Sequence, residues 1–182
     1  ELAERHGGKK LRGRVRNAPH LPLAHPFCCT REIARLLALD EDYADAWYNL
    51  GLTRRGLNVG NSAIEAYLRC LELEPDHEKA LYNMAIAQSD VGDVRGAFRT
   101  YERLIERNPG HLEGRNNFAV LLMRERKYPK ATAAFQKVVS LDSSYVTAWY
   151  NLGICLRRQK KMAAAIRAYR KTLQLDPSHS KA

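Results

Sequence analysis

Four asparagines recur in this chain at a constant interval of 34 residues. They are Asn49, Asn83, Asn117 and Asn151. A side-chain amide carries hydrogen-bond donors and an acceptor, so it can pair with a peptide group of any sequence. Asparagine is a mediocre helix former, and helix packing alone requires no amide at this interval. The pattern indicates either a row of peptide-binding amides or hydrogen bonds within a repeat array.

Basic side chains follow Asn49, Asn117 and Asn151 closely in the sequence. They are Arg54, Arg55, Arg124, Arg126, Arg157, Arg158, Lys160 and Lys161. Cations are favoured near the carboxyl end of a helix, which accounts for part of this set. Net charge also rises as −2, 0, +3 and +6 over successive 34-residue segments from Ala44, and local effects do not explain the rise. We therefore expect Arg55, Arg124, Arg157 and Arg158 to meet an acidic segment of a partner.

Histidines and cysteines near the amino terminus form no convincing metal site. His20, His25, Cys28 and Cys29 are irregularly spaced and interrupted by prolines, so we predict no metal. The neighbouring basic stretch KKLRGRVR could be a localisation or nucleic-acid tail, although such composition is common by chance. The sequence has no phosphate loop, paired carboxylates or nucleophile motif, and we predict neither enzymatic activity nor a cofactor.

The remaining two cysteines and the lack of a long apolar run indicate where the protein is located. Cys70 and Cys155 stand where small apolar residues are expected, which favours a reducing compartment. No apolar run approaches the ~18 residues that span a membrane. We expect a cytoplasmic protein without membrane contact, with nuclear and ciliary locations left open.

The elements that carry the asparagines are predicted from the apolar spacing. In each 34-residue segment, apolar residues follow the i, i+3, i+4, i+7 pattern of two amphipathic helices. The small residues Gly51, Ala85, Ala119 and Gly153 should face the aromatic residues Tyr67, Tyr101, Phe135 and Tyr169 across each hairpin. Asp42, Asp76, Gly110, Ser144 and Ser178 are expected to cap helix starts. Asn58 and Gly92 suit the inner turns, whereas Arg126 and Lys160 offer no easy left-handed residue there.

The pattern W-x2-L-G, then A-x3-F/Y and P, at a period of 34 residues resembles the tetratricopeptide repeat over residues 44–177. The resemblance implies an all-α fold, an α-solenoid in which antiparallel helix hairpins form a right-handed superhelix. Repeats 1 to 4 would occupy residues 44–77, 78–111, 112–145 and 146–179. Repeat 3 departs most, because Arg115 replaces the large apolar residue of the motif.

The flanking segments complete the predicted organisation. Residues 27–43 resemble the second helix of a preceding repeat and should cap the array. Residues 1–26 are basic and rich in Gly and Pro, and we expect them to be irregular or disordered. Residues 180–182 would begin a further truncated element, so the chain is expected to be a piece of a longer protein.

The resemblance also implies a binding surface, because first helices line the concave side of such superhelices and some arrays hold a peptide backbone with an asparagine ladder. Flanking residues would form the floor of that groove: Tyr48, Tyr82, Tyr150, Leu52, Ile86, Val120 and Ile154. Alternatively, the aliphatic residues of this set pack between neighbouring first helices. The Lys and Arg pattern of a chaperone-tail clamp is absent.

We therefore predict a protein-protein interaction scaffold that receives an extended peptide or helix and assembles a larger complex. Two alternatives stay open: the targeting arm of a larger, glycosyltransferase-like enzyme, and less favoured, an RNA-binding helical repeat. Self-association is also expected if Ile166, Tyr169 and Leu173 of the last second helix form an exposed stripe.

Overall fold

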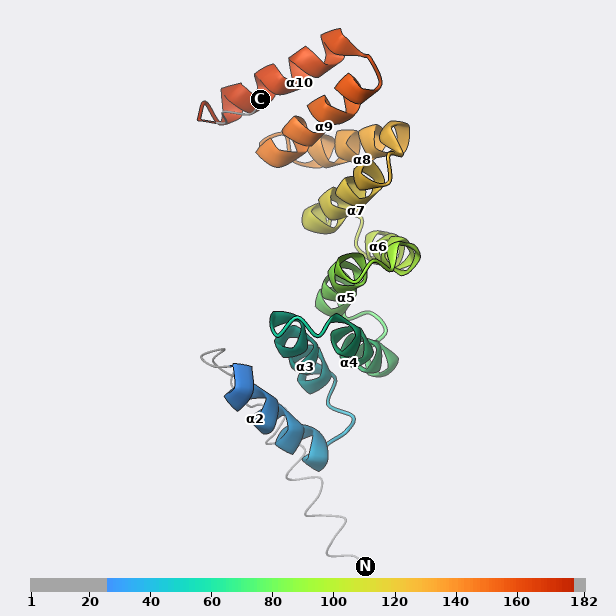
Figure 1. Ribbon diagram of the computed structural model, residues 1–182, viewed down its shortest axis with the longest axis vertical. Coiled ribbons are helices and arrows are strands. Elements are labelled where there is room, and N and C mark those ends of the chain that lie inside the picture. The colour runs from blue at the N-terminus through green and yellow to red at the C-terminus, as the bar shows by residue number, and fades with distance from the viewer. Residues whose placement is uncertain (1–25, 179–182) are drawn as a thin grey trace, which may run out of the picture. The chain divides into compact units, whose positions relative to one another are not determined.

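The computed structural model describes residues 26–178, and over that range its regular elements are all α-helices joined by short turns (Figure 1). The helices are α2 (Pro26–Leu39), α3 (Ala44–Gly56), α4 (Gly60–Leu73), α5 (Glu78–Asp90), α6 (Val94–Arg107), α7 (Leu112–Arg124), α8 (Tyr128–Leu141), α9 (Val146–Arg158) and α10 (Met162–Leu175). The predicted all-α class is confirmed. Predictions for residues 1–25 and 179–182 lie outside the described residues.

Each predicted repeat corresponds to two helices. The first helices α3, α5, α7 and α9 begin at the first residue of repeats 1 to 4. Apolar spacing explains the second helices: in α8, Ala131, Phe135 and Val138 are buried at one-turn intervals. Pro129 falls in the first turn of α8, where a missing backbone N–H costs little.

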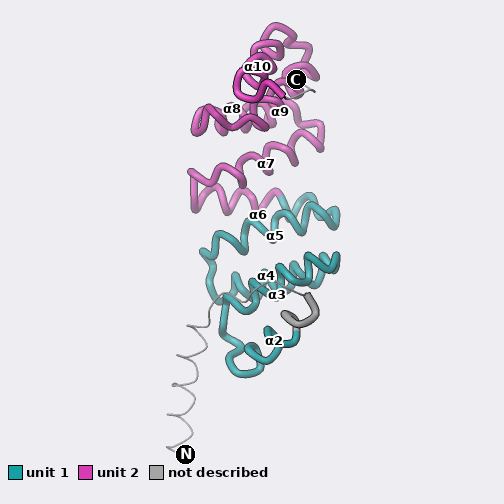
Figure 2. The backbone as a smooth tube through the Cα atoms, turned by 90° about the vertical axis from the view of Figure 1, so that its left-hand side faces the viewer, with its two compact units in different colours: residues 1–97 teal, residues 98–182 magenta. Residues whose placement is uncertain are grey.

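The chain divides into two compact units, residues 1–97 and 98–182 (Figure 2). One core of unit 1 joins Ile33 of α2 to Ala46 and Leu50 of α3 and to Ala66 of α4. The core of unit 2 is built around Phe135 and Val138 of α8 and includes Leu152 of α9. The buried Ile33 explains how α2 covers the start of repeat 1.

Small and aromatic residues interlock within the first and last hairpins, as the sequence predicts. A Cβ on Gly51 would lie 2.4 Å from Cε1 of Tyr67, and one on Gly153 would lie 2.5 Å from Cε1 of Tyr169. Tyr67 is fully buried. Tyr169 therefore packs under Gly153, and the expected exposed stripe reduces to Ile166 and Leu173, which are 47% and 39% exposed.

The prediction for the helix caps is wrong by one residue. The cap positions of the first helices are Tyr43, His77, His111 and Tyr145. Nδ1 of His77 accepts a hydrogen bond from the backbone N–H of Ala80 (3.1 Å), and Nδ1 of His111 accepts one from Gly114 (3.0 Å). An imidazole nitrogen thus caps α5 and α7, whereas Tyr43 and Tyr145 make no side-chain cap hydrogen bond.

The inner turns of all four hairpins use a left-handed residue. Asn58 and Gly92 have φ of 59° and 86°, as their types suggest. Arg126 and Lys160 adopt φ of 56° and 61° at the same position in repeats 3 and 4. Side chains other than glycine and asparagine rarely adopt this conformation, so these two turns hold strained backbone.

Candidate functional site

The side chain of Asn83 is held inside unit 1 and is 9% exposed. Its Nδ2 donates to the backbone oxygen of Lys79 (2.9 Å) and to the hydroxyl of Tyr48 (3.3 Å). Its Oδ1 accepts a hydrogen bond from Nη1 of Arg55 (2.9 Å). Both amide hydrogens and one acceptor position of Asn83 are therefore used between repeats 1 and 2, as the internal alternative predicts for this asparagine.

Tyr48 is fixed by its aromatic neighbours. Its ring centroid lies 5.0 Å from that of His77 and 6.1 Å from that of Tyr67. Burial raises the pKa of the Tyr48 phenol, and the Arg55 guanidinium partly opposes that rise. The phenol stays protonated and can donate or accept at Asn83. Tyr48, Arg55 and Asn83 together form what we call the interrepeat clamp.

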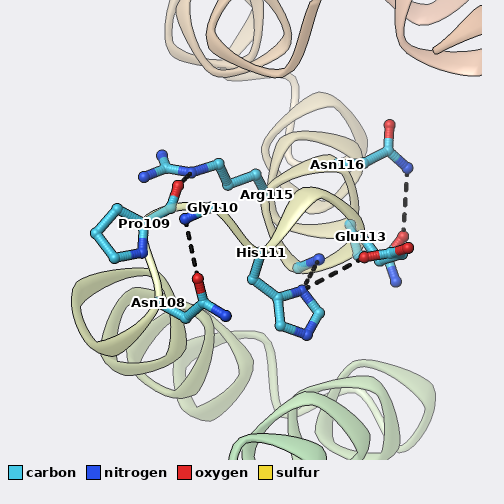
Figure 3. Close-up of polar contacts among 9 residues, drawn as sticks. Asn108, Pro109, Gly110, His111, Glu113, Arg115 and Asn116 are labelled. Atoms are coloured by element: carbon cyan, nitrogen blue, oxygen red, sulfur yellow. Dashed lines mark hydrogen bonds and ion pairs between the residues drawn. The ribbon is translucent and has the colours of Figure 1, made fainter. Parts of the chain in front are cut away.

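Unit 2 has no equivalent of this clamp among its described residues. Asn116 stands where repeats 1, 2 and 4 have tyrosine, and its Nδ2 donates to Oδ1 of the half-buried Asn117 (3.4 Å; Figure 3). The buried Oδ1 of Asn116 has no hydrogen-bond partner. Asn151 is 8% exposed and has no side-chain hydrogen bond to a described residue. Asn49 of α3 is half-buried.

The residues expected beside the asparagines are all half-buried. This holds for the tyrosines of the set, Tyr48, Tyr82 and Tyr150, and for the aliphatic residues Leu52, Ile86, Val120 and Ile154. The Tyr150 ring lies 6.0 Å from that of Tyr169 in the same hairpin. Val120 packs against the core of unit 2. Each side chain thus divides its surface between internal packing and the exterior.

Arg124, Arg157 and Arg158 are exposed at the carboxyl ends of the neighbouring helices α7 and α9. Arg126, Lys160 and Lys161 in the turns that follow are exposed as well. Arg55 differs, because its guanidinium is half-buried and hydrogen-bonded to Asn83. Arg54 is half-buried as well, and its Nη1 donates to the backbone oxygen of Ser62 (2.9 Å). The basic set therefore separates into two half-buried, hydrogen-bonded arginines in unit 1 and a group open to solvent in unit 2, which we call the arginine cluster.

A pocket that the sequence did not predict lies on another side of α7. Its lining includes Glu102 of α6, Arg115 and Phe118 of α7, and Ala134 of α8. One feature of the sequence points to this pocket: Arg115 stands where the repeat motif has a large apolar residue.

The described residues form neither a metal-binding group of side chains nor a membrane-spanning helix. Within the residues that the structure describes, no three His, Cys, Asp or Glu side chains gather as metal ligands. The predictions about His20, His25, Cys28 and Cys29 concern side chains outside that range. No helix between Pro26 and Leu175 is long and apolar enough to cross a bilayer.

Comparisons with known proteins agree with the repeat period and the hairpins. Two family models described as tetratricopeptide repeat match the chain, one over residues 44–77 and the other over residues 82–145 and 116–180. No curated protein matches. The matched segments cover well over half of the chain.

Solved structures with a similar fold include MamA from Desulfovibrio magneticus RS-1, with a TM-score of 0.80, 18% identity and coverage of 95% of this chain and 97% of that chain. Another MamA crystal structure has a TM-score of 0.78 at 19% identity and covers 84% of this chain and 89% of that one. YrrB, described as a TPR protein with an unusual peptide-binding site, has a TM-score of 0.73 at 21% identity, with 83% and 79% covered. Together with the phased hairpins, these matches show that the chain belongs to the tetratricopeptide repeat family.

Proposed function

We propose that this chain is a protein-interaction scaffold that holds an extended, acidic segment of a partner protein against the first helices of unit 2. The observation that carries this proposal is the exposed arginine cluster of Arg124, Arg157 and Arg158 on α7 and α9. Repeats 3 and 4 have net charges of +3 and +6, so the cluster has no equal opposing charge nearby in the sequence. Such a field favours association with a segment of opposite sign.

The proposed contacts combine amides with apolar surface. Asn117 and Asn151 would pair with the partner backbone, and Val120 and Ile154 would contact its side chains. Two amides contribute on the order of 2 kcal/mol, less than the ~4 to 15 kcal/mol that association costs. Apolar contacts and the arginine cluster must therefore supply most of the affinity. Asn83 and Arg55 belong to the clamp of unit 1 and are not part of this surface.

Charge reversal tests the proposal with a control inside the same unit. The variant Arg124→Glu, Arg158→Glu should lose partners that the wild-type chain captures from a lysate at 50 mM NaCl, because the attraction becomes repulsion. The variant Arg167→Glu, Arg170→Glu changes the net charge by the same amount at two exposed residues of α10. It should still capture the partners of the wild-type chain. Capture that is the same for both variants and unchanged by 300 mM NaCl would contradict the proposal.

A further inference from the structure

The first helices of repeats 1, 3 and 4 differ in how they fill one equivalent space. Nε1 of Trp47 donates to the backbone oxygen of Glu41 (2.8 Å), and Nε1 of Trp149 donates to that of Ser143 (2.9 Å). In repeat 3, Nε of Arg115 donates to the equivalent oxygen of Pro109 (2.6 Å; Figure 3). Arg115 thus replaces the hydrogen bond of the indole, but its thin aliphatic stem cannot replace the volume of the ring.

The space that the ring would fill remains open in unit 2. A cavity of about 370 Å³ is lined by Glu102, Ile105, Glu106, Arg115, Phe118 and Ala134. An adjoining cavity of about 440 Å³ shares Glu102, Phe118 and Ala134 and extends along α8 to Lys127 and Lys130. Because three residues line both cavities, the two lie side by side, and we call them together the α7 groove.

The floor of the α7 groove is a fixed aromatic surface. The Phe118 ring meets the Phe98 ring edge to face, with centroids 5.7 Å apart at 87°, and lies 6.4 Å from the Tyr101 ring. Such pairs hold ring orientations in place. Ala134 on the α8 side is too small to cover Phe118. A partner side chain would therefore meet a surface formed before binding.

The α7 groove carries charges of both signs. Glu102 lines both cavities, Glu106 and Arg115 line only the first, and Lys127 and Lys130 line only the second. Nζ of Lys127 lies 4.5 Å from the centroid of the Phe98 ring. Glu106 and Phe98 are eight residues apart on α6, which corresponds to about 12 Å. The two lysines of the second cavity favour a carboxylate of a bound segment beside them.

We propose that the α7 groove binds a short segment of a partner protein in which a tryptophan inserts between Arg115, Phe118 and Ala134 and an adjacent acidic residue reaches Lys127 and Lys130. The occupant is indicated by the chain itself, because Trp47 and Trp149 fill the equivalent space in repeats 1 and 4. The guanidinium of Arg69 also lies over the Trp47 ring, 5.8 Å from its centroid. Arg115 can meet an incoming indole in the same way.

The α7 groove is distinct from the surface of the proposed function. An α-helix turns once every ~3.6 residues, so Arg115, Phe118 and Leu122 share one face of α7, and Asn117 and Val120 lie on the opposite face. The two sites can therefore be disrupted separately.

The test uses a defined probe, the peptide acetyl-Gly-Trp-Asp-Asp-Gly-amide, titrated into the full ¹⁵N-labelled chain by NMR. We expect saturable shifts at Phe98, Phe118 and Ala134. Replacing Trp by Ala or both Asp by Lys in the peptide should weaken binding on the order of tenfold or more. Arg115→Trp restores the residue of repeats 1 and 4, closes the groove from within, and should weaken binding to a similar extent.

Two further variants keep the test decisive. Ala134→Leu fills the groove from α8 and should also weaken binding, which replaces Arg115→Trp if that variant does not fold. Gln174→Ala at an exposed residue of α10, outside both surfaces, should leave binding unchanged. Absence of shifts, shifts centred on Asn117 and Ile154, or equal binding by Arg115→Trp would overturn the proposal. A sedimentation coefficient that differs between wild type and Arg115→Trp would assign the groove to a second copy of the chain and overturn it too.

Discussion

Repeats 1 and 3 have the same pair of helices but use their first helices differently. In α3, Trp47 fills the space beside α2, and Tyr48 and Arg55 reach the amide of Asn83 in the next repeat. In α7 the equivalent residues are Arg115, Asn116 and Met123, which neither fill that space nor form the clamp. The same three positions of the first helix therefore make internal contacts in repeat 1 and leave surface open in repeat 3.

Repeats 1 and 3 share one backbone arrangement but present different side chains on their first helices. The backbone of the hairpin is determined by small and aromatic residues that both repeats retain: Gly51 with Tyr67, and Ala119 with Phe135. The residues that differ lie on the faces of the first helix. Repeat 3 can lose internal contacts there without losing its fold.

The largest effect should come from exchanging the residues that distinguish the repeats. Trp47→Arg removes a half-buried aromatic side chain from the core of unit 1 and should lower the free energy of unfolding by roughly 2 to 3 kcal/mol. The reverse change, Arg115→Trp, should leave stability unchanged or raise it, because it adds buried apolar area. Urea denaturation followed by circular dichroism measures both. Equal losses in the two variants would show that the two repeats do not differ in packing.

An intermediate effect should separate Asn83 from Asn151, the two buried members of the 34-residue series. Asn83→Ala removes three hydrogen bonds and leaves Arg55 and Tyr48 without their partner, so it should cost about 1 to 3 kcal/mol. Asn151→Ala is the matched control, because Asn151 is buried to a similar extent but lacks the clamp, and it should cost well under half as much. The same denaturation experiment applies. A larger loss for Asn151→Ala would disprove the structural role that we assign to the clamp.

The smallest effect concerns alkaline pH. Cys70 and Val138 occupy equivalent buried positions in repeats 1 and 3, and burial raises the pKa of the Cys70 thiol from 9.0 to about 12. The folded thiol keeps its proton while the unfolded thiol ionises, so its contribution is complete below pH 9 and is lost between pH 9 and about 12. Between pH 7 and 10 the wild-type chain should lose about 1 kcal/mol more unfolding free energy than Cys70→Val. If the unfolding free energies of the two proteins change by the same amount from pH 7 to 10, burial of the Cys70 thiol does not contribute in this way.

The fold could be predicted because it depends on features that the sequence states directly. Side-chain size and apolar spacing define the hairpins, and the pairing of Gly51 with Tyr67 and of Gly153 with Tyr169 follows from them. The caps could not be predicted from the usual cap residues, because His77 and His111 accept through a ring nitrogen and Tyr43 and Tyr145 make no side-chain cap hydrogen bond.

The site was less predictable because it depends on which side chains reach one another between repeats. The period of 34 residues identified the asparagines but not that Tyr48 and Arg55 use the Asn83 amide. The α7 groove was missed for a related reason. The sequence shows that Arg115 departs from the motif. It does not show that the Arg115 side chain turns to the backbone oxygen of Pro109 and leaves Phe118 uncovered.

The left-handed turns at Arg126 and Lys160 have a consequence for how the array is adapted to its task. Glycine or asparagine would relax these corners, as Gly92 and Asn58 do in the first two hairpins. Long cationic side chains occupy them instead, in the half of the chain where positive charge accumulates. The inner turns of the later hairpins thus combine an unfavourable backbone conformation with an exposed cation, which is a cost that a neutral glycine would avoid.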